Sequence, residues 1–191
     1  MNRYESYKDS GVEWIGEIPS HWSLIINGML FHEEIRKPRP TDRPLSLSQK
    51  SGVVLADDLE IQTLKTSSYD NWKQVLENDL VLNRFKAHLG VLFASSLNGM
   101  VSFHYGVFAS RIKLVPQYYE YLFHTEKYKY IYAANSKGMT VGLQNLSNKD
   151  FYAVHSIYPP YNEQKIIVDY LKDKTLKIEQ YVSARERERA A

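Results

Sequence analysis

The sequence predicts an α+β protein in which a globular domain is followed by one long C-terminal helix. Between residues 44 and 115, short segments rich in Val, Leu, Ile and Phe are punctuated by Gly, a pattern typical of strands. Between Pro116 and Asn135, apolar residues instead recur at helical spacing. After Pro159-Pro160 neither Gly nor Pro interrupts the chain, which favours a single helix. We therefore expect the domain at residues 1–160 and the helix at residues 161–191.

Composition and charge limit the possible functions. Of the 191 residues, 43% are hydrophobic and 24% are charged, so the chain can bury a core and is not disordered. The formal net charge of +2 permits a nucleic-acid partner without requiring one. The absence of Cys excludes disulfides and thiolate chemistry. Because the N-terminus has no signal-peptide core and no apolar run approaches the roughly 20 residues of a membrane span, we expect a cytoplasmic protein with no membrane partner.

The first forty residues predict an ordered lead segment and then a loop. Two Gly and one Pro between Ser6 and Trp22 exclude a continuous helix. Trp14 and Trp22 need burial, so we expect both side chains to pack this segment over the core. The stretch Glu34–Arg43 is basic and broken by two Pro, which predicts a loop.

The middle of the chain predicts four strands and a helix. Pro44–Ser48 alternates apolar and polar residues, as a half-buried strand does. The other expected strands are rich in Val, Leu, Ile and Phe: Asp79–Asn83, Leu89–Ala94 and Met100–Val115. Pro116 then suits the first turn of a helix, and Gly138 lies beyond its end.

The last section predicts a helix with a coiled-coil seam. Asn162 is a favourable N-cap, so the helix should begin at Glu163 and extend for roughly 27 residues, about 40 Å. The residues spaced alternately by three and four are Gln164, Ile167, Leu171, Lys174, Ile178, Tyr181 and Arg185. One seam does not stabilise an isolated helix, so a partner is needed. We assign the partner contact to Ile167, Leu171, Ile178 and Tyr181.

Motifs for catalysis or for metal and cofactor binding are not found. The six His are scattered, and the cluster His32-Glu33-Glu34 is better explained as a solvated loop than as a metal site. No Gly-rich phosphate-binding motif and no Gly-x-Ser-x-Gly elbow occurs. The sequence therefore predicts no metal, no cofactor and no catalytic residue.

Two fragments are similar to those of enzymes that act on DNA. Tyr158-Pro159-Pro160-Tyr161 is similar to the Asn-Pro-Pro-Tyr loop of DNA amino-methyltransferases, but Tyr158 lacks the side-chain oxygen that accepts a hydrogen bond from the target amino group. Glu163-Gln164-Lys165, with Asp150 upstream, imitates a metal-dependent nuclease, but here it opens a helix. A small methyltransferase or nuclease therefore stays an alternative, as does a plain protein-interaction module.

Binding chemistry is concentrated in two loops. Asn83–Gly90 follows a strand and interleaves donors with an aromatic residue, and Ser136–Asn145 combines Gly with amide, hydroxyl and basic side chains. Arg, Gln and Asn are the side chains that read base edges, and Lys and small hydroxyls suit phosphates.

The order of segments resembles a known family. The opening Tyr7–Trp22, YKDSGVEWIGEIPSHW, closely resembles the N-terminus of specificity subunits of type I restriction-modification enzymes. The further matches follow in the family's order: Leu45–Val54, Asp79–Arg84, Asp150-Phe151 leading to Ile157–Pro160, and Glu163–Ile167 with Tyr170-Leu171. The resemblance covers nearly the whole chain.

This resemblance implies a DNA-recognition subunit that performs no chemistry. Residues up to about Pro160 would be a target recognition domain that reads bases in double-stranded DNA. The remainder would be a spacer helix that packs against a second spacer. It would also dock methyltransferase (modification) subunits, which hold S-adenosylmethionine, while a restriction subunit adds ATP-driven translocation and cleavage.

The chain departs from the family in two respects. Glu77-Asn78 stand where the family usually has Pro-Gly, and Asn is the non-Gly residue that best tolerates a left-handed turn. A complete specificity subunit has two recognition domains and two spacers, whereas this chain has one of each, as a natural half-subunit or as a fragment. Two copies paired through the spacer would form a symmetric dimer that reads an inverted repeat.

The resemblance and the loop chemistry together select the candidate DNA contacts. We expect Lys and Arg of the basic loop to contact phosphates: Arg36, Lys37 and Arg39. We expect the residues of the two later loops to contact DNA as base readers or phosphate ligands: Arg84, Lys86, His88, Lys137, Thr140, Gln144 and Asn145.

Overall fold

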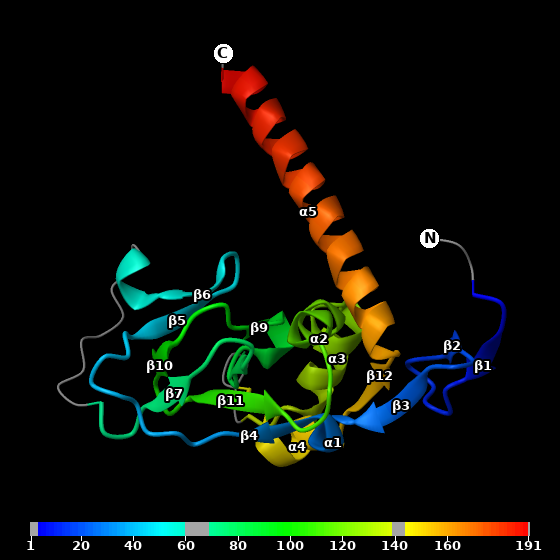
Figure 1. The fold of residues 1–191 in the computed structure, drawn as a ribbon, viewed down its shortest axis with the longest axis horizontal. Helices are drawn as coiled ribbons and strands as arrows, with labels where there is room; N and C mark the ends of the chain where they lie inside the picture. The colour runs from blue at the N-terminus through cyan, green and yellow to red at the C-terminus, as the bar shows by residue number, and fades with distance from the viewer. Residues whose placement is uncertain (1–3, 60–68, 139–143, 191) are drawn as a thin grey trace.

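A four-stranded antiparallel sheet lies at the centre of the computed structural model, which describes residues 4–59, 69–138 and 144–190 (Figure 1). The strands follow the order β4 (Phe31–Glu33), β11 (Tyr105–Ser110), β8 (Leu80–Asn83) and β9 (Leu92–Ala94). In the register of β11 with β8, Tyr105 stands opposite Asn83. The strands expected at Asp79–Asn83 and Leu89–Ala94 are therefore present, although they are shorter than expected. The expectation of one strand over Met100–Val115 is wrong, because a turn at residues 103–104 divides this segment into two strands that belong to different sheets.

The two faces of this sheet belong to different hydrophobic cores. Leu80 and Leu82 of β8 pack into one cluster, and the residue between them, Val81, packs into the other. On β11, Phe108 and Val107 divide in the same way. This division follows from the strand period of two, because successive side chains point to opposite faces.

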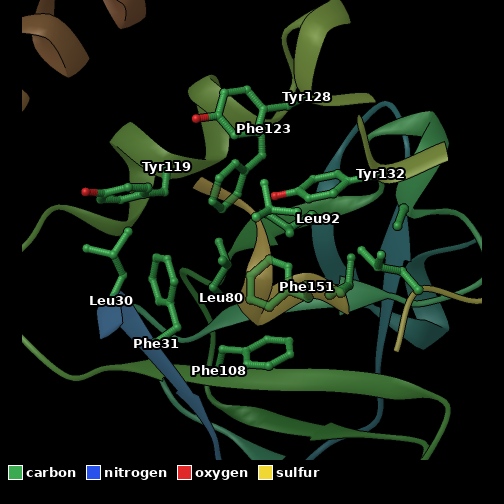
Figure 2. Packing of buried hydrophobic residues seen from close by; sticks show 14 of the residues in the cluster. Leu30, Phe31, Leu80, Leu92, Phe108, Tyr119, Phe123, Tyr128, Tyr132 and Phe151 are labelled. Carbon is green, nitrogen blue, oxygen red and sulfur yellow. The ribbon is translucent and has the colours of Figure 1, made fainter. Parts of the chain in front are cut away.

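Helices cover the face with the larger core. They are α1 (Asn27–Leu30), α2 (Pro116–Phe123), α3 (Glu126–Asn135) and α4 (Asn148–Ala153). Figure 2 shows Phe31 and Phe108 from the sheet among aromatic rings that these helices contribute. Phe31 meets Tyr119 edge to face at a centroid distance of 5.2 Å, and Phe108 lies 4.7 Å from Phe151.

The expectation of one helix between Pro116 and Asn135 is wrong, because α2 ends at Phe123 and α3 begins at Glu126. The buried aromatic residues Phe123 and Tyr128 are five residues apart, which does not fit one face of a continuous helix. The break at His124 and Thr125 resets the phase, so that α2 and α3 both direct aromatic rings into the core.

Short strand pairs cover the other face. The expected strand after Pro44 is β5 (Leu45–Ser48), which pairs with β6 (Gly52–Leu55), followed by a 3-10 turn at Ala56–Asp58. The second pair is β7 (Lys73–Val75) and β10 (Gly99–Val101). Gly99 permits close packing here, because a Cβ at this position would lie 2.5 Å from the Arg43 carbonyl oxygen.

The lead segment is ordered, as expected, but only one of its two Trp residues packs on the core. It forms a hairpin of β1 (Tyr7–Asp9) and β2 (Glu17–Pro19). Trp14 packs against the larger core and meets Tyr128 edge to face at 5.0 Å. Trp22 instead stays half-exposed, and its indole N–H donates to Glu163 at 2.9 Å.

The C-terminal helix α5 (Tyr161–Ala190) projects away from the domain (Figure 1). It begins two residues before the expected Glu163, because the Gln164 backbone N–H already donates to the Pro160 carbonyl at 3.0 Å. Asn162 therefore lies in the first turn and is not the N-cap. The remaining pair of strands, β3 (Ser23–Ile26) and β12 (His155–Tyr158), joins the lead segment to the chain that enters α5.

Only the first turns of α5 pack on the domain. Gln164 is fully buried, accepts a hydrogen bond from the Val115 N–H at 2.8 Å and donates to the Pro159 carbonyl at 2.8 Å. Of the four predicted partner residues, Ile167 packs against the larger core and Leu171 is half-buried, while Ile178 and Tyr181 are exposed. Within the described residues, no helix combines the length and the apolar character that a membrane span requires.

The prediction for Asn78 is confirmed. Its φ of 70° is the positive value that a left-handed turn requires, and the other described residues with positive φ are Gly. The side chain also accepts a hydrogen bond from Gln117 at 3.0 Å. Asn thus supports the tight entry into β8 at a position where the family that the sequence resembles usually has Gly.

Candidate nucleic-acid interface

The described ends of the two loops in which we predicted DNA contacts lie close together in the structure. The first runs from Asn83 to Gly90 and includes a 3-10 turn at Ala87–Leu89. The second closes on itself through backbone hydrogen bonds between Lys137 and Asn145, at 3.1 and 2.9 Å. The Leu146 N–H then donates to the Arg84 carbonyl at 3.1 Å, which joins the two loops.

The candidate residues on these loops differ in exposure. Lys86, Lys137 and Asn145 are exposed. His88 and Gln144 are half-buried, and the Gln144 Oε1 is enclosed without a hydrogen-bond partner among the described residues. Thr140 lies outside the described residues.

Arg84 is held by a carboxylate at the end of β4. Its guanidinium donates to Glu33 at 2.6 Å, and the Lys73 ammonium donates to the same oxygen at 2.7 Å. The Asn148 amide donates to the other oxygen of Glu33. Three side chains that are distant in sequence thus meet at one carboxylate, and Lys73 also donates to the Tyr105 carbonyl at 2.8 Å.

The environment of Glu33 keeps it ionised. Burial raises the pKa of its carboxyl, but the hydrogen bond from Lys73, the charge of Arg84 and the hydrogen bond from Asn148 together lower the pKa below its ordinary value. The expectation that His32-Glu33-Glu34 is a solvated loop is therefore wrong, because His32 and Glu33 belong to β4 and Glu33 is paired inside the protein. The sequence did not reveal this role of Glu33, because the three residues that bind its carboxylate are distant from it in sequence.

The sequence pointed to Phe85 as an aromatic residue among donors, but two further exposed aromatic rings near Arg84, those of Phe103 and His104, were missed. The His104 ring lies 3.9 Å from Phe103 and 5.7 Å from Phe85, measured between centroids. Phe103 and His104 occupy the turn before β11, and Phe85 occupies the turn after β8. Large aromatic residues at turn positions were the signal that could have revealed them.

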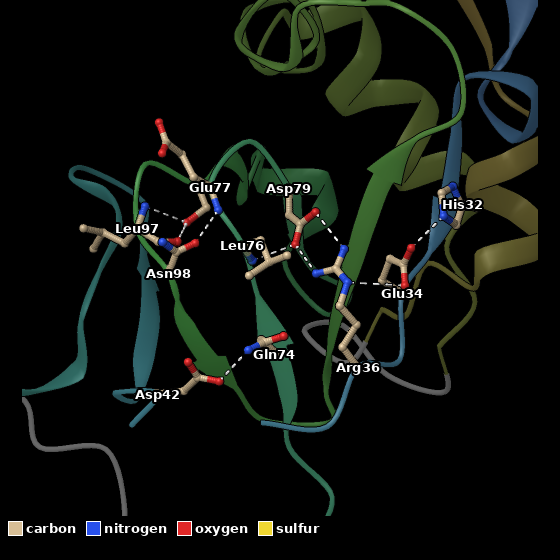
Figure 3. Close-up of polar contacts among 11 residues, drawn as sticks. His32, Glu34, Arg36, Asp42, Gln74, Leu76, Glu77, Asp79, Leu97 and Asn98 are labelled. Carbon is tan, nitrogen blue, oxygen red and sulfur yellow. Dashed lines mark hydrogen bonds and ion pairs between the residues drawn. The ribbon is translucent and has the colours of Figure 1, made fainter. Parts of the chain in front are cut away.

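The two Arg residues of the basic loop before β5, Arg36 and Arg39, differ in their contacts and exposure. Arg36 makes a two-pronged ion pair with Asp79, at 2.7 and 3.1 Å, and approaches Glu34 at 3.4 Å (Figure 3). Lys37 and Arg39 are exposed instead.

Lys37 and Arg39 line an open groove of about 670 Å³ together with Tyr69 and Met100. These two side chains are better placed for phosphate contact than Arg36, whose guanidinium is engaged within the protein.

The fragments that imitate enzymes are engaged in structural contacts. The Tyr158 hydroxyl donates to the Lys113 carbonyl at 3.0 Å. Asp150 interacts with Ser147 at the start of α4, whereas Glu163 binds His21 and Trp22 at the start of α5. In the described ranges, no three His, Asp or Glu side chains are grouped so that they could hold a metal ion.

Comparisons with known proteins relate the chain to one family and one fold. The family model described as the type I restriction modification DNA specificity domain matches residues 44–184. The HsdS subunit from Thermoanaerobacter tengcongensis is similar in structure, with a TM-score of 0.54 and 20% identity over 96% of this chain and 42% of that chain. A structure described for complex assembly and conformational transition of the type I R-M system gives a TM-score of 0.57 and 18% identity over 96% of this chain and 44% of that chain.

At these identities the two solved structures show a shared fold. The chain spans less than half the length of either of them. No curated protein sequence matches the chain significantly.

Proposed function

The chain belongs to the type I restriction modification DNA specificity family, and we propose on this basis that it reads a duplex DNA sequence for a restriction-modification complex without catalysing a reaction itself. The observation that supports this most is the joining of the two predicted DNA-contacting loops through Leu146 and Arg84. Exposed Lys86 lies two residues from this junction, and exposed Asn145 lies beside it and pairs with Lys137 through backbone hydrogen bonds, which supports their use as phosphate and base contacts.

In this proposal the chain divides at Pro160. Residues 1–160 form the target recognition domain and residues 161–191 the spacer helix, which docks methyltransferase subunits and through them a restriction subunit in the cytoplasm. The length of the chain, less than half that of the two similar structures, is consistent with one recognition domain where a full subunit has two. Two copies paired through α5 would supply the second domain.

Methylation in cells tests the proposal directly. Cells that express this chain with its modification subunit should methylate one bipartite sequence whose halves are inverted repeats. Cells with the modification subunit alone should not methylate it. Methylation that is independent of this chain would contradict the proposal, and methylation by the purified chain alone would favour the enzyme alternative.

Binding of the isolated chain to DNA should be steeply salt-dependent. The net charge of +2 is small, so the attraction depends on local basic residues such as Lys37, Lys86 and Lys137. About three to six phosphate contacts predict a slope of roughly −3 to −5 in a plot of log affinity against log salt concentration. Fluorescence anisotropy across a salt series measures the slope, and an affinity that does not change with salt would contradict the prediction.

Two exposed side chains should differ in how they affect sequence preference. Asn145→Ala should relax the preference at one base pair by about 1–3 kcal/mol, because Asn can read adenine with two hydrogen bonds. Lys37→Ala should weaken binding to all sequences alike, because a phosphate contact carries no base information. Selection from a random DNA pool with each variant measures both effects. Equal preference profiles for Asn145→Ala and the wild type would contradict the base-reading role.

A further inference from the structure

Two adjacent β-turns carry aromatic side chains at their central positions. One turn is closed by a hydrogen bond from the Lys86 N–H to the Asn83 carbonyl at 3.0 Å. The other is closed by a hydrogen bond from the Tyr105 N–H to the Ser102 carbonyl at 3.1 Å. Because Asn83 stands opposite Tyr105 in the sheet, both turns lie at the same end of β8 and β11.

Turn formation does not explain these residues. Gly, Pro, Asn, Asp and Ser favour the central positions of β-turns, whereas Phe85, Phe103 and His104 occupy them here. Core packing does not explain them either, because Phe103 is 55% exposed and Phe85 is 37% exposed. We call Phe85, Phe103 and His104 the aromatic tip.

The surroundings of the aromatic tip favour a polyanion as its ligand. Exposed Lys86 follows Phe85 in the chain, while Arg84 of the same turn is paired with Glu33. The neighbouring loop adds exposed Lys137. Aromatic rings flanked by cations match a nucleic acid, since the rings stack on bases while the cations neutralise phosphates.

The position of the tip also suits insertion into DNA. The turns extend from paired strands, and the ion pairs of Glu33 with Arg84 and Lys73 hold the strand ends together. A wedge has to be rigid to unstack bases, because a mobile side chain would be displaced more easily than a base step is opened.

We propose, building on the proposed function, that the aromatic tip stacks on DNA bases at a step that opens when the chain binds its target. Phe103 is the more exposed of the two Phe residues, and its ring is the one that enters between the bases. The His104 ring lies 3.9 Å from Phe103 between centroids, and Phe85 lies 5.7 Å from His104. The bound duplex is therefore locally unstacked and kinked at the contact.

The test uses the full chain and a duplex that wild-type protein enriches from a random pool. Phe85→Ala with Phe103→Ala should lower the affinity for this duplex about 10- to 100-fold, since stacking contributes substantially per base. Tyr7→Ala, which removes an exposed ring from the remote N-terminal hairpin, should leave the affinity unchanged. Thermal unfolding followed by circular dichroism checks that both variants are folded.

A second readout detects stacking itself. Phe103→Trp should lose fluorescence when the duplex binds, beyond the loss seen with wild-type protein, whereas Tyr7→Trp should not. Wild-type protein should also bind a duplex with a mismatch at the contacted step about 3- to 10-fold more tightly, because that step is already unstacked. The double Ala variant should lose this preference.

The outcomes separate the inference from the proposed function. Sequence enrichment by the wild type, together with unchanged affinity of the double variant and no extra quenching in Phe103→Trp, would overturn the wedge alone. A double variant that keeps its DNA affinity but no longer binds modification subunits would also overturn it, by making the tip a protein contact. Failure of the wild type to bind any DNA would overturn both.

Discussion

Glu33→Gln should lower the free energy of unfolding by about 2–3 kcal/mol near neutral pH, because it leaves two mostly buried cations without their counter-charge. The side chains of Glu33, Lys73 and Arg84 are 14%, 11% and 19% exposed, and the two cations contact one carboxylate oxygen at 2.7 and 2.6 Å. Gln keeps the shape of Glu but removes the negative charge, so Lys73 and Arg84 repel each other across it. Urea unfolding of both proteins measures the difference.

The size of this difference should depend on pH. The hydrogen bond from Lys73, the charge of Arg84 and the hydrogen bond from Asn148 outweigh burial, so the pKa of Glu33 lies below 4.5 in the folded protein. A lowered folded-state pKa means that ionised Glu33 stabilises the fold fully above its ordinary pKa. This stabilisation is lost as the pH falls from about 4.5 through the lowered value. The wild type and Glu33→Gln should therefore differ most near neutral pH and converge in acid.

A matched control separates this network from a simple change of charge. Glu126→Gln also removes one carboxylate, but that side chain is 90% exposed and pairs with Lys129 three residues along the same helix. Its effect should stay within about 0.5 kcal/mol. An equal loss in both variants, or a loss in Glu33→Gln that does not change with pH, would contradict the role assigned to Glu33.

The elements that were predicted correctly are those whose conformation is determined by residues adjacent in the sequence. The strand at Leu45–Ser48 follows from its alternating pattern, and the left-handed Asn78 follows from the conformational freedom of one residue type. Local patterns also indicated that a long helix follows Pro159-Pro160. Its first residue was misplaced because Asn162 looked like an N-cap, whereas the helical hydrogen bonds already begin with the Gln164 N–H donating to the Pro160 carbonyl.

The candidate interface depends on contacts between distant segments. The two loops were predicted from donor chemistry, but their junction at Leu146 and Arg84 requires the folded sheet and helices. Glu33 was grouped with His32 and Glu34 because they are neighbours in sequence, although strand alternation sends Glu33 to the opposite side. The aromatic tip also depends on strand pairing, which brings Phe85 and His104 together.

The proposed homodimer should depend on the free part of α5. Ile178 and Tyr181 are each 62% exposed, and Val182 beside them is 47% exposed. Ile167 and Leu171 are at least partly covered by the chain's own domain, so substitution there would disturb the domain as well as any partner contact. Ile178 and Tyr181 are therefore the positions that test pairing without affecting the core.

The dimer should be weak, because its apolar stripe is narrow. A stable interface buries roughly 1,200–2,000 Å² in total, and the few apolar residues at the free end of α5 cover only part of that area. Lys174 and Arg185 lie on the same seam, stacked on Tyr170 and Tyr181 at 5.3 and 5.4 Å from the ring centroids. We expect a dissociation constant on the order of 10 µM for the isolated chain, lowered when modification subunits hold two copies together.

Ile178→Asp should abolish this dimer. Two-fold symmetry brings one new carboxylate from each copy into the apolar contact, where both carboxylates would lose their hydration. Leu176→Asp is the matched control: Leu176 is 54% exposed on the same helix, but it lies roughly 160° around the axis from Ile178. Light-scattering mass across a concentration series should show a monomer for Ile178→Asp and a wild-type transition for Leu176→Asp. A wild type that stays monomeric even with modification subunits would contradict the dimer. A dimer that Ile178→Asp leaves intact would show that a different surface of the chain makes the contact.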